Sequence, residues 1–194
     1  MARRSDHTRP ELTQLALESA RKIIAKEGIT ALSGRKVTAR MGYTIGTLYQ
    51  LFDDMDDLVE RVNAQTLAML FEHCQQGARH DGVAQQLKAL GILFGEFVKE
   101  HPNEWDAIMS YRYKDDHTTS EEYHREILRL FGLMEDATRQ FYGDGEQEDH
   151  AADMAMLWAS LTGILGVAFS ERQVGGSLEQ MLEHLIAMYL KARS

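Results

Sequence analysis

Leu32 to Phe52 read LSGRKVTARMGYTIGTLYQLF, and this stretch decides the fold because it predicts two short helices joined by a tight turn. Ser33 can cap the first helix with its hydroxyl, Gly42 supplies the turn, and Thr44 can cap the second helix. The two helices share one buried face, since apolar side chains recur at helical spacing. These side chains are Val37, Met41, Leu48 and Phe52.

The other side chains of this stretch are exposed when that face is buried, and they suit a nucleic-acid partner. Hydroxyls and cations can bond phosphates, an aliphatic group can contact a thymine methyl, and a glycine lets the backbone approach base edges closely. A helix that enters the major groove of DNA requires such a set. We therefore predict a DNA-binding helix-turn-helix whose exposed contact residues are Arg35, Lys36, Ile45, Gly46, Thr47, Tyr49 and Gln50.

Charge is distributed unevenly along the 194 residues. The formal net charge of -9 argues against a polyanionic partner, because DNA binding depends on cations that neutralise phosphates. However, residues 1–52 carry nine Lys and Arg against four Asp and Glu, a net +5, so the remainder carries -14. This asymmetry favours a small DNA-reading head on an acidic body; an acidic soluble surface with chance clustering is the alternative.

Helical periodicity runs through the whole chain. Alternation of β-branched residues is nearly absent, and the two prolines, Pro10 and Pro102, stand where each can open a helix. We predict an all-α fold of about nine helices, with a DNA-binding domain at 1–53 and a second domain at 54–194. The expected helices lie at about 10–27, 33–41, 44–51, 54–70, 83–98, 105–109, 123–141, 151–169 and 178–190.

The composition indicates a reducing, aqueous compartment. The lone cysteine, Cys74, excludes an intramolecular disulfide framework and a multi-cysteine zinc site, so we expect a cytoplasmic protein. The N-terminus is positively charged but no apolar run follows it, which argues against a secretory signal. The uncharged, mostly apolar stretch Met154 to Phe169 is shorter than the roughly 18 to 20 residues of a membrane span. We therefore predict a buried helix there and no membrane partner.

Motifs for catalysis or metal binding do not occur in the sequence. It has no Walker-type glycine loop, HExxH or Gly-x-Ser-x-Gly elbow, and its carboxylates lie in runs such as Asp53 to Asp57 that are typical of helix starts and solvated surface. Histidines seven positions apart, such as His73 and His80, are too far apart on one helix to hold one ion. We expect no enzymatic activity, no metal and no cofactor.

The two C-terminal helices are apolar over more than one side, and one neighbouring helix could not cover them. We predict that each subunit contributes both helices to a four-helix bundle across a two-fold axis, and a helical core within one chain is the alternative. A dimer suits a helix-turn-helix, because two reading helices about one helical turn apart match a palindromic site. The expected interface residues are Leu157, Leu161, Leu165, Leu178, Leu182, Leu185 and Tyr189.

The order of these parts resembles a TetR/AcrR-type bacterial transcriptional regulator. The resemblance rests on the run Gly42-Tyr43-Thr44-Ile45-Gly46-Thr47-Leu48-Tyr49 after a short capped helix, and it covers about residues 10–62. The second domain matches in layout. Its run Trp158 to Gly163 is similar to the Trp-His-Gly signature of one branch of the family, with Thr162 in place of the histidine.

The resemblance implies a role for each position of the motif. Ser33 and Arg35 would meet the DNA backbone or a base, Thr44 and the three residues after it would face the groove, and Tyr49 would reach a phosphate. Met55 stands where the family often has a phosphate-contacting lysine, and carboxylates flank it. Binding would then depend more on an N-terminal segment that reaches along the backbone or into a minor groove, although a solvated tail is the alternative. That segment carries Arg3, Arg4 and Arg9.

The resemblance further implies that the second domain binds a small molecule, and that occupancy changes the separation of the two heads. The leading hypothesis is a homodimeric repressor that an effector releases from a palindromic operator on double-stranded DNA. An effector-independent adaptor that recruits a protein partner is one alternative, and an all-α enzyme or carrier is another. The residues expected to line the effector pocket, for which plain core packing is the alternative, are Trp105, Met109, Tyr113, Tyr123, Phe131, Met134 and Trp158.

Overall fold

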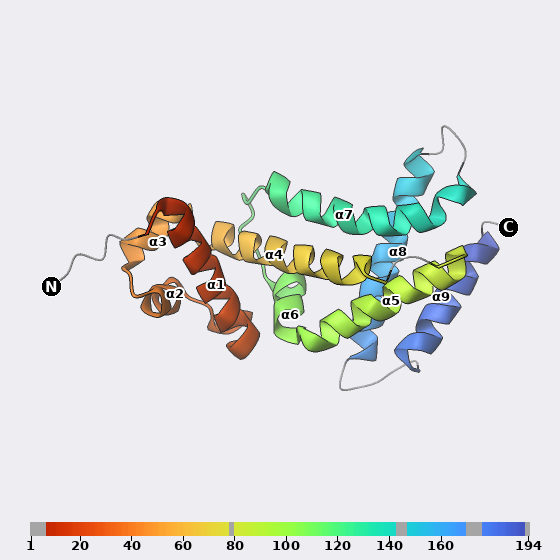
Figure 1. Cartoon of the computed structure of the whole chain (residues 1–194), viewed down its shortest axis with the longest axis horizontal. Coiled ribbons are helices and arrows are strands. Elements are labelled where there is room, and N and C mark those ends of the chain that lie inside the picture. Colours follow the sequence, from red (N-terminus) through yellow and green to blue (C-terminus); the bar gives the residue numbers. More distant parts are fainter. Residues whose placement is uncertain (1–6, 78–79, 143–146, 170–175, 193–194) are drawn as a thin grey trace. The chain divides into compact units, whose positions relative to one another are not determined.

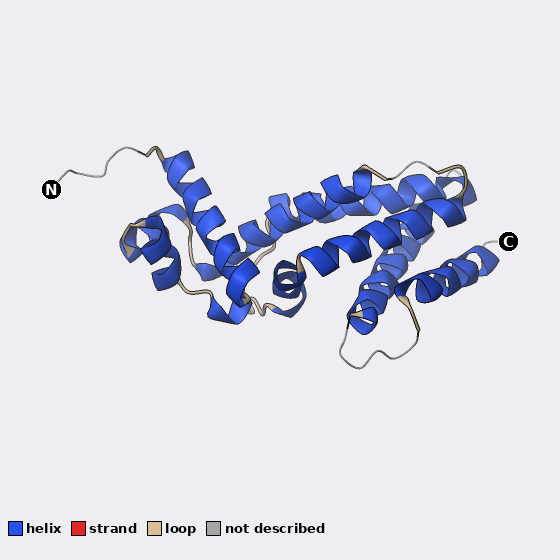
Figure 2. Ribbon diagram, turned by 60° about the horizontal axis from the view of Figure 1, so that its bottom comes forward, coloured by secondary structure: helices blue, strands red, loops and turns tan. Residues whose placement is uncertain are grey.

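The computed structural model describes residues 7–77, 80–142, 147–169 and 176–192 (Figure 1). These residues form nine α-helices and two short 3-10 helices, and Figure 2 shows no strand among them. The prediction of an all-α fold with about nine helices is confirmed. The α-helices are α1 (Arg9–Glu27), α2 (Gly34–Met41), α3 (Ile45–Leu51), α4 (Met55–Gln75), α5 (Val83–Glu100), α6 (Pro102–Ser110), α7 (Glu121–Thr138), α8 (Gln147–Ala168) and α9 (Leu178–Ala192), and the 3-10 helices are Ile29–Ala31 and Arg139–Phe141.

Contacts within the chain divide it into two compact units. Unit 1 comprises Met1–Leu67 and His101–His124, and unit 2 comprises Ala68–Glu100 and Arg125–Ser194. Helix α6 and the segment after it therefore belong with the N-terminal helices, although α5 precedes them in the chain. The functional boundary at residue 53 stays a prediction, because this division follows contacts and not function.

Unit 1 is built around α1. A capping box starts this helix: the Glu11 carboxylate accepts the Thr8 backbone N–H at 2.6 Å, and the Thr8 hydroxyl accepts the Glu11 backbone N–H at 3.5 Å. Gly28 ends the helix with φ at 81°. One face of α1 carries apolar residues at i, i+4 and i+8, and burial of this face joins α1 to α2, α3 and α6. The core of unit 1 includes Ala16, Ala20, Ile24, Val37, Leu48, Phe52, Leu58 and Val62.

Two glycines let α9 approach α5 closely in unit 2. A Cβ atom on Gly91 would lie 2.8 Å from a methyl group of Leu182, and a Cβ atom on Gly95 would meet a methyl group of Leu178. The two glycines are about one helical turn apart on α5, and the two leucines are about one turn apart on α9. The leucines therefore occupy two consecutive notches of α5. We name these positions the glycine notches.

Helix α8 is apolar but largely exposed within unit 2. The stretch His150–Ala168 has a mean hydropathy of 1.5 and the length of a membrane span, and 17% of it is buried. The helix predicted here is present, and contacts within the single chain leave much of it uncovered, so its burial by a second surface stays a prediction. The physical reason is that α8 has apolar residues on two sides, whereas α5, α7 and α9 cover one of them.

Candidate functional site

One glycine and two hydroxyl caps set the turn between α2 and α3. Gly42 adopts φ 77° and ψ 29°, a left-handed conformation that glycine takes without steric cost, and it ends α2. The Thr44 hydroxyl accepts the backbone N–H of Thr47 at 3.3 Å and starts α3. The Ser33 hydroxyl caps α2 in the same way, accepting the backbone N–H of Lys36 at 3.4 Å. The two predicted short helices and their tight turn are thus present.

Close approach of α2 to α3 buries one face of α3 and exposes the other. A Cβ atom on Gly34 would lie 2.7 Å from Ile45 Cδ1 and 3.3 Å from a methyl group of Leu48, so a side chain there would push α3 away. Leu48 is 1% exposed, whereas Ile45 is 42% and Tyr49 is 50% exposed. The predicted reading residues lie together on this open face: Thr44, Ile45, Gly46, Tyr49 and Gln50 are exposed, and Thr47 is half-buried.

Two cations predicted to contact DNA, Arg35 and Lys36, are exposed near the start of α2. Lys36 Nζ lies 2.9 Å from the carboxylate of Glu27 at the end of α1. This hydrogen bond, and then the lysine charge, lowers the pKa of Glu27 below its usual value. Both side chains are about half exposed, so the ion pair stabilises the fold little. Lys36 must leave Glu27 if it is to bind a phosphate.

We expect Glu27→Gln to strengthen DNA binding by up to about fivefold at low salt, because it frees Lys36 and removes a negative charge beside it. Fluorescence anisotropy of a labelled duplex at several salt concentrations measures this gain, which should shrink as salt rises. Glu18→Gln is the matched control, since Glu18 pairs with Lys22 elsewhere on α1. An equal gain from both variants would show that total charge, and not the Lys36 contact, is responsible.

The N-terminal segment meets the turn between α2 and α3 at His7. His7 Nδ1 lies 2.8 Å from the Tyr43 hydroxyl, and the two rings meet edge to face with centroids 6.2 Å apart. The chain before α1 therefore starts beside the reading helices. Arg3 and Arg4 lie outside the described residues, and their contact with DNA stays a prediction.

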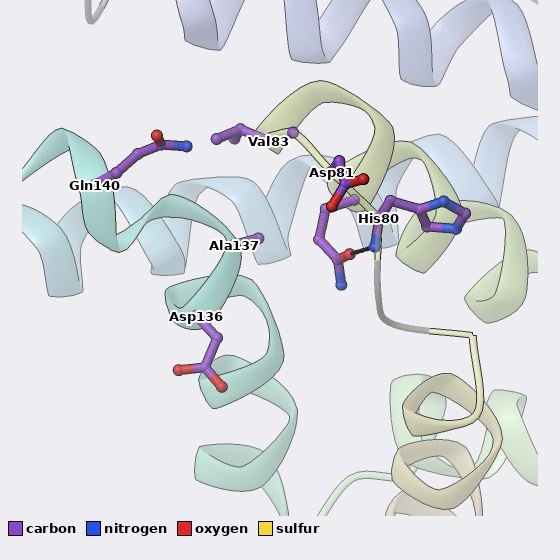
Figure 3. A pocket seen from close by; sticks show the side chains of 8 residues that line it. His80, Asp81, Val83, Asp136, Ala137 and Gln140 are labelled. Atoms are coloured by element: carbon purple, nitrogen blue, oxygen red, sulfur yellow. Dashed lines mark hydrogen bonds between the residues drawn. The ribbon is translucent and has the colours of Figure 1, made fainter.

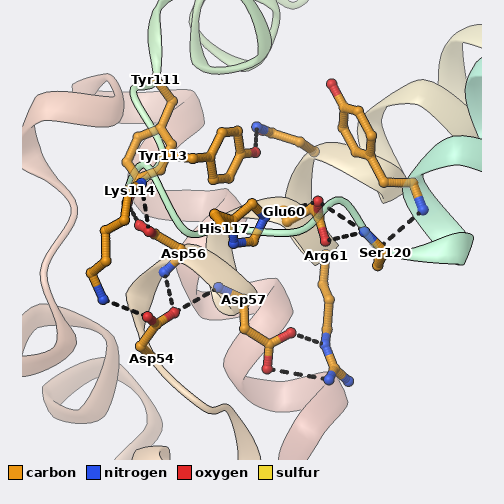
Figure 4. Close-up of polar contacts among 12 residues, drawn as sticks. Asp54, Asp56, Asp57, Glu60, Arg61, Tyr111, Tyr113, Lys114, His117 and Ser120 are labelled. Carbon is orange, nitrogen blue, oxygen red and sulfur yellow. Dashed lines mark hydrogen bonds and ion pairs between the residues drawn. The ribbon is translucent and has the colours of Figure 1, made fainter.

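Buried polar side chains follow one another along α4 and bond the segment 111–120 (Figure 4). Asp56 is 4% exposed and accepts the Tyr111 hydroxyl at 2.7 Å and the Lys114 backbone N–H at 3.1 Å. Burial, and next the bond to Asp56, raises the pKa of the Tyr111 hydroxyl. The carboxylates that open α4 were expected on the solvated surface, and Asp56 corrects this, because the segment 111–120 covers it.

Glu60, one turn after Asp56 on α4, makes the next set of bonds to segment 111–120. It is 3% exposed and accepts the backbone N–H of Ser120 at 3.1 Å, and its other oxygen lies 3.0 Å from His117 Nε2. The His117 ring stacks on Tyr113 with centroids 4.6 Å apart, and the Tyr113 hydroxyl lies 3.0 Å from Asn63 Nδ2 on the next turn of α4. Segment 111–120 is thus tied to α4 at three successive turns. Since α4 begins directly after α3, these bonds brace the base of the reading helix.

Unit 2 has a small, partly open apolar cavity of about 40 Å³ between α5, α7, α8 and α9. Such a cavity stays dry and receives apolar ligands. We name it the apolar cavity. Its described wall contains no polar side chain and consists of Leu87, Leu90, Gly91, Met134, Leu157, Leu161, Leu182, Leu185 and Ile186.

The seven residues predicted to line an effector pocket are divided between the two units, so no pocket within one unit gathers all of them. Met134 lies in the wall of the apolar cavity. Phe131 and Trp158 pack against each other with ring centroids 5.5 Å apart, in the same apolar cluster as Met134. The missed lining residues are mostly leucines, which at helical spacing cannot be told from plain core. The unit 1 residues are Trp105, which is buried, Met109, which is half exposed, and Tyr113 and Tyr123, which are partly buried.

A second cavity in unit 2, of about 370 Å³, lies beside the start of α5 and the end of α7 (Figure 3). The backbone N–H of His80 donates to Gln86 Oε1 at 2.8 Å, while the Asp136 carboxylate points away from His80 and Asp81. Among the described residues, no three side chains of His, Cys, Asp or Glu gather as metal ligands. The polar groups of this cavity do not converge, so the apolar cavity is the better candidate for a small-molecule site.

Four residues of the predicted dimer interface point into unit 2. Leu157, Leu161, Leu165 and Leu182 are at most 8% exposed, so they belong to the core of their own chain. The regularly spaced leucines of α8 face α5 and α9 within the single chain and leave a different face of α8 open, and the dimer interface stays a prediction. Leu178, Leu185 and Tyr189 are partly buried.

The open face of α8 consists of small and apolar residues. A Cβ atom on Gly163 or Gly166 would have nothing within 4 Å, so contacts within the described chain do not require glycine at either position. Helix α9 exposes Met188, at 55%. Small residues let the backbone of a second helix come close. The face comprises Met156, which is 67% exposed, Ala159, Gly163, Gly166 and Val167.

Two family models match the chain. The model of bacterial regulatory proteins of the tetR family matches residues 16–62, and the model of a tetracyclin repressor-like C-terminal domain matches residues 87–189. The first covers α2, α3 and the start of α4, and the second covers the whole wall of the apolar cavity. No curated protein matches the chain by sequence.

Solved structures share the fold at low sequence identity. A protein with unknown function from Rhodococcus sp. RHA1 is 14% identical with a TM-score of 0.73, over 98% of each chain. A TetR-family transcriptional regulator from Streptomyces coelicolor is 16% identical with a TM-score of 0.67, over 94% of this chain and 99% of the other. The transcriptional regulator FadR from Bacillus subtilis, in complex with stearoyl-CoA, is 10% identical with a TM-score of 0.66, over 90% of this chain and 96% of the other.

Proposed function

The chain belongs to the TetR family of bacterial transcriptional regulators, and from this premise we propose that it is a homodimeric repressor released from a palindromic operator by a small-molecule effector. The exposed face of α3 carries the proposal, because Ile45 and Tyr49 project outward while Leu48 is buried beneath them. A helix of this kind presents side chains to base edges in the major groove. The proposed regulator would act in the cytoplasm and would need no catalytic role.

A second copy of the chain is the proposed cover for α8. The open α8 face and Met188 of α9 together leave more apolar surface exposed than a soluble helix pair usually does. Two α8 and two α9 helices would form a four-helix bundle about a two-fold axis. The same symmetry would present two reading helices to the two halves of a palindrome.

The apolar cavity supports control by an effector. It lies in the region that matches the C-terminal family model, and FadR, whose fold is shared, was solved with stearoyl-CoA bound. Release requires that the effector bind the DNA-incompetent conformation more tightly than the DNA-bound one. A protein-recruiting adaptor without an effector would need no such cavity, so the effector-controlled repressor is the better supported of the two.

Anisotropy titrations against a pool of palindromic duplexes at several salt concentrations test the proposal. We expect one duplex to bind selectively, with an affinity that falls as salt rises and a stoichiometry of two chains per palindrome. Binding to every duplex alike, or to none at any salt, would refute sequence-specific regulation. Transcription in vitro from a promoter that carries the selected duplex then distinguishes repression from activation.

Arg35→Ala should cost roughly 1 to 3 kcal/mol of DNA-binding free energy if the guanidinium makes a bidentate base contact, and less if it touches only phosphate. Anisotropy against the selected duplex and its single-base variants separates the two cases, because loss of a base contact relaxes specificity at one position. Tyr49→Phe is the comparison variant, and its effect should be similar on all duplexes, since a hydroxyl on phosphate reads no base. Unchanged affinity would remove Arg35 from the site.

A further inference from the structure

We propose that the effector carries a linear aliphatic chain, and that this chain enters the apolar cavity along the glycine notches of α5. This inference rests on the proposed effector-controlled function and adds the chemical class of the effector. It follows from three properties of the site: the apolar wall, the small volume beside the glycine notches, and the hydrogen bonds that neighbouring polar side chains already make.

The wall of the apolar cavity contains only aliphatic side chains, one methionine and one glycine among its described residues. A ligand atom placed there can form dispersion contacts but no hydrogen bonds with side chains. A hydroxyl, amide or charged group in this position would lose its bonds to water without replacement. The part of the effector that enters the cavity is therefore hydrocarbon.

The space is narrow, and it can lengthen in one direction. A volume of about 40 Å³ holds only a few atoms, so an effector must displace side chains. Leu182 and Leu178 occupy consecutive notches over Gly91 and Gly95, and a methyl group of Leu165 lies 3.4 Å from the Cβ position of Gly95. Rotation of these leucine ends would extend the space along α5, over the two glycines. A linear chain fits such a space, whereas a fused ring system needs all four helices to separate.

The Tyr189 hydroxyl, on a side chain packed against the apolar cluster of Met134 and Leu157, belongs to a group of polar side chains that are already bonded to one another. The Tyr142 hydroxyl donates to the Asp153 carboxylate and lies 2.8 Å from the Tyr189 hydroxyl, and burial raises the pKa of Tyr142. His150 stacks on Tyr142 and lies 3.0 Å from the Thr138 hydroxyl. These partners are satisfied without a ligand, so they offer no free anchor to a cationic or strongly polar effector.

Calorimetric titration of the full-length protein with 1-butanol, 1-hexanol and 1-octanol tests the proposal without DNA. We expect affinity to rise about fourfold for each added methylene group. The compound 1,8-octanediol has the same length but must bury a second hydroxyl, and we expect it to bind at least about tenfold more weakly than 1-octanol. Equal affinity for 1-octanol and the diol, or affinity independent of chain length, would overturn the proposal.

Three variants locate the binding. Gly91→Ala places a methyl group against the cavity and should weaken 1-octanol about fourfold or more, whereas Gly132→Ala, in a helical position with nothing within 4 Å, should not change it. In Leu182→Ala, affinity should keep rising for alkanols about three carbons longer than the parent protein accommodates, because the substitution removes three side-chain carbons from the space beside Gly91. Thermal melts by circular dichroism confirm that each variant folds. Loss of binding in Gly132→Ala, or no gain in Leu182→Ala, would place the ligand elsewhere.

DNA measurements separate this inference from the function on which it rests. If the protein binds its operator but 1-octanol shows no dependence on chain length, the inference fails and the regulator remains. If 1-octanol binds as expected but saturating amounts leave operator binding unchanged, release by an effector in this cavity fails while the assignment of the cavity to aliphatic chains holds.

Discussion

Gly163→Glu is expected to yield a folded monomer that binds the operator roughly 100-fold more weakly than the parent protein. The Cβ position of Gly163 is open, so the glutamate fits within its own chain, and replacing a helical glycine favours the helix by about 0.5 to 1 kcal/mol. In a dimer, the same carboxylate would face the α8 helix of the second copy with no partner. The defect should therefore lie in association and not in folding.

Gly132→Glu is the matched control for this variant. It adds the same charge at another open helical glycine, on α7 instead of α8. Sedimentation velocity gives the oligomeric state of both variants, and anisotropy gives their operator affinity. A dimeric Gly163→Glu protein with normal DNA binding would show that α8 is not the interface.

Glu60→Ala is expected to destabilise unit 1 by about 3 kcal/mol, because it leaves the partly buried Ser120 N–H and His117 without their acceptor. Operator affinity should fall with it, since α4 braces the base of α3. Urea unfolding followed by circular dichroism measures the loss. Glu60→Gln retains an acceptor oxygen and should lose about half as much, because a bond to a neutral oxygen is weaker than one to a carboxylate.

Glu72→Ala provides the reference on the same helix. Glu72 is exposed and pairs with Arg129 at 3.0 Å, so its removal should cost less than about 1 kcal/mol. If Glu60→Ala were no more destabilising than Glu72→Ala, the bonds between α4 and segment 111–120 would not brace the head. Normal unfolding with impaired DNA binding would show that Glu60 positions α3 without stabilising unit 1.

Local chemistry made the head predictable from the sequence. Ser33, Gly42 and Thr44 determine where α2 and α3 begin and end, and these interactions span at most a few residues. The ion pair between Lys36 and Glu27 was not predictable, because it joins two helices whose relative rotation the sequence pattern does not specify. For the same reason the carboxylates at the start of α4 were assigned to solvent, although segment 111–120 covers Asp56.

Unit 2 was harder to predict because its helices are apolar on more than one side. Periodicity identified Leu157, Leu161 and Leu165 as a stripe, but it could not decide whether that stripe met another helix of the same chain or a second copy. The glycines resolve this ambiguity only in the folded structure. Side chains of α9 occupy the space beside Gly91 and Gly95, whereas the space beside Gly163 and Gly166 is open. A cavity bounded by leucines likewise has no sequence signature separate from core.

The contact of Gly34 with Ile45 limits how this protein can be redesigned to recognise a new operator. Ile45 offers a base-reading surface, yet its Cδ1 also occupies the space that a side chain on Gly34 would need. Exchanging Ile45 would therefore alter the crossing of α2 and α3 together with the recognition code. Libraries for altered specificity should keep these two positions fixed as a pair and vary Gln50, which is exposed on the same helix.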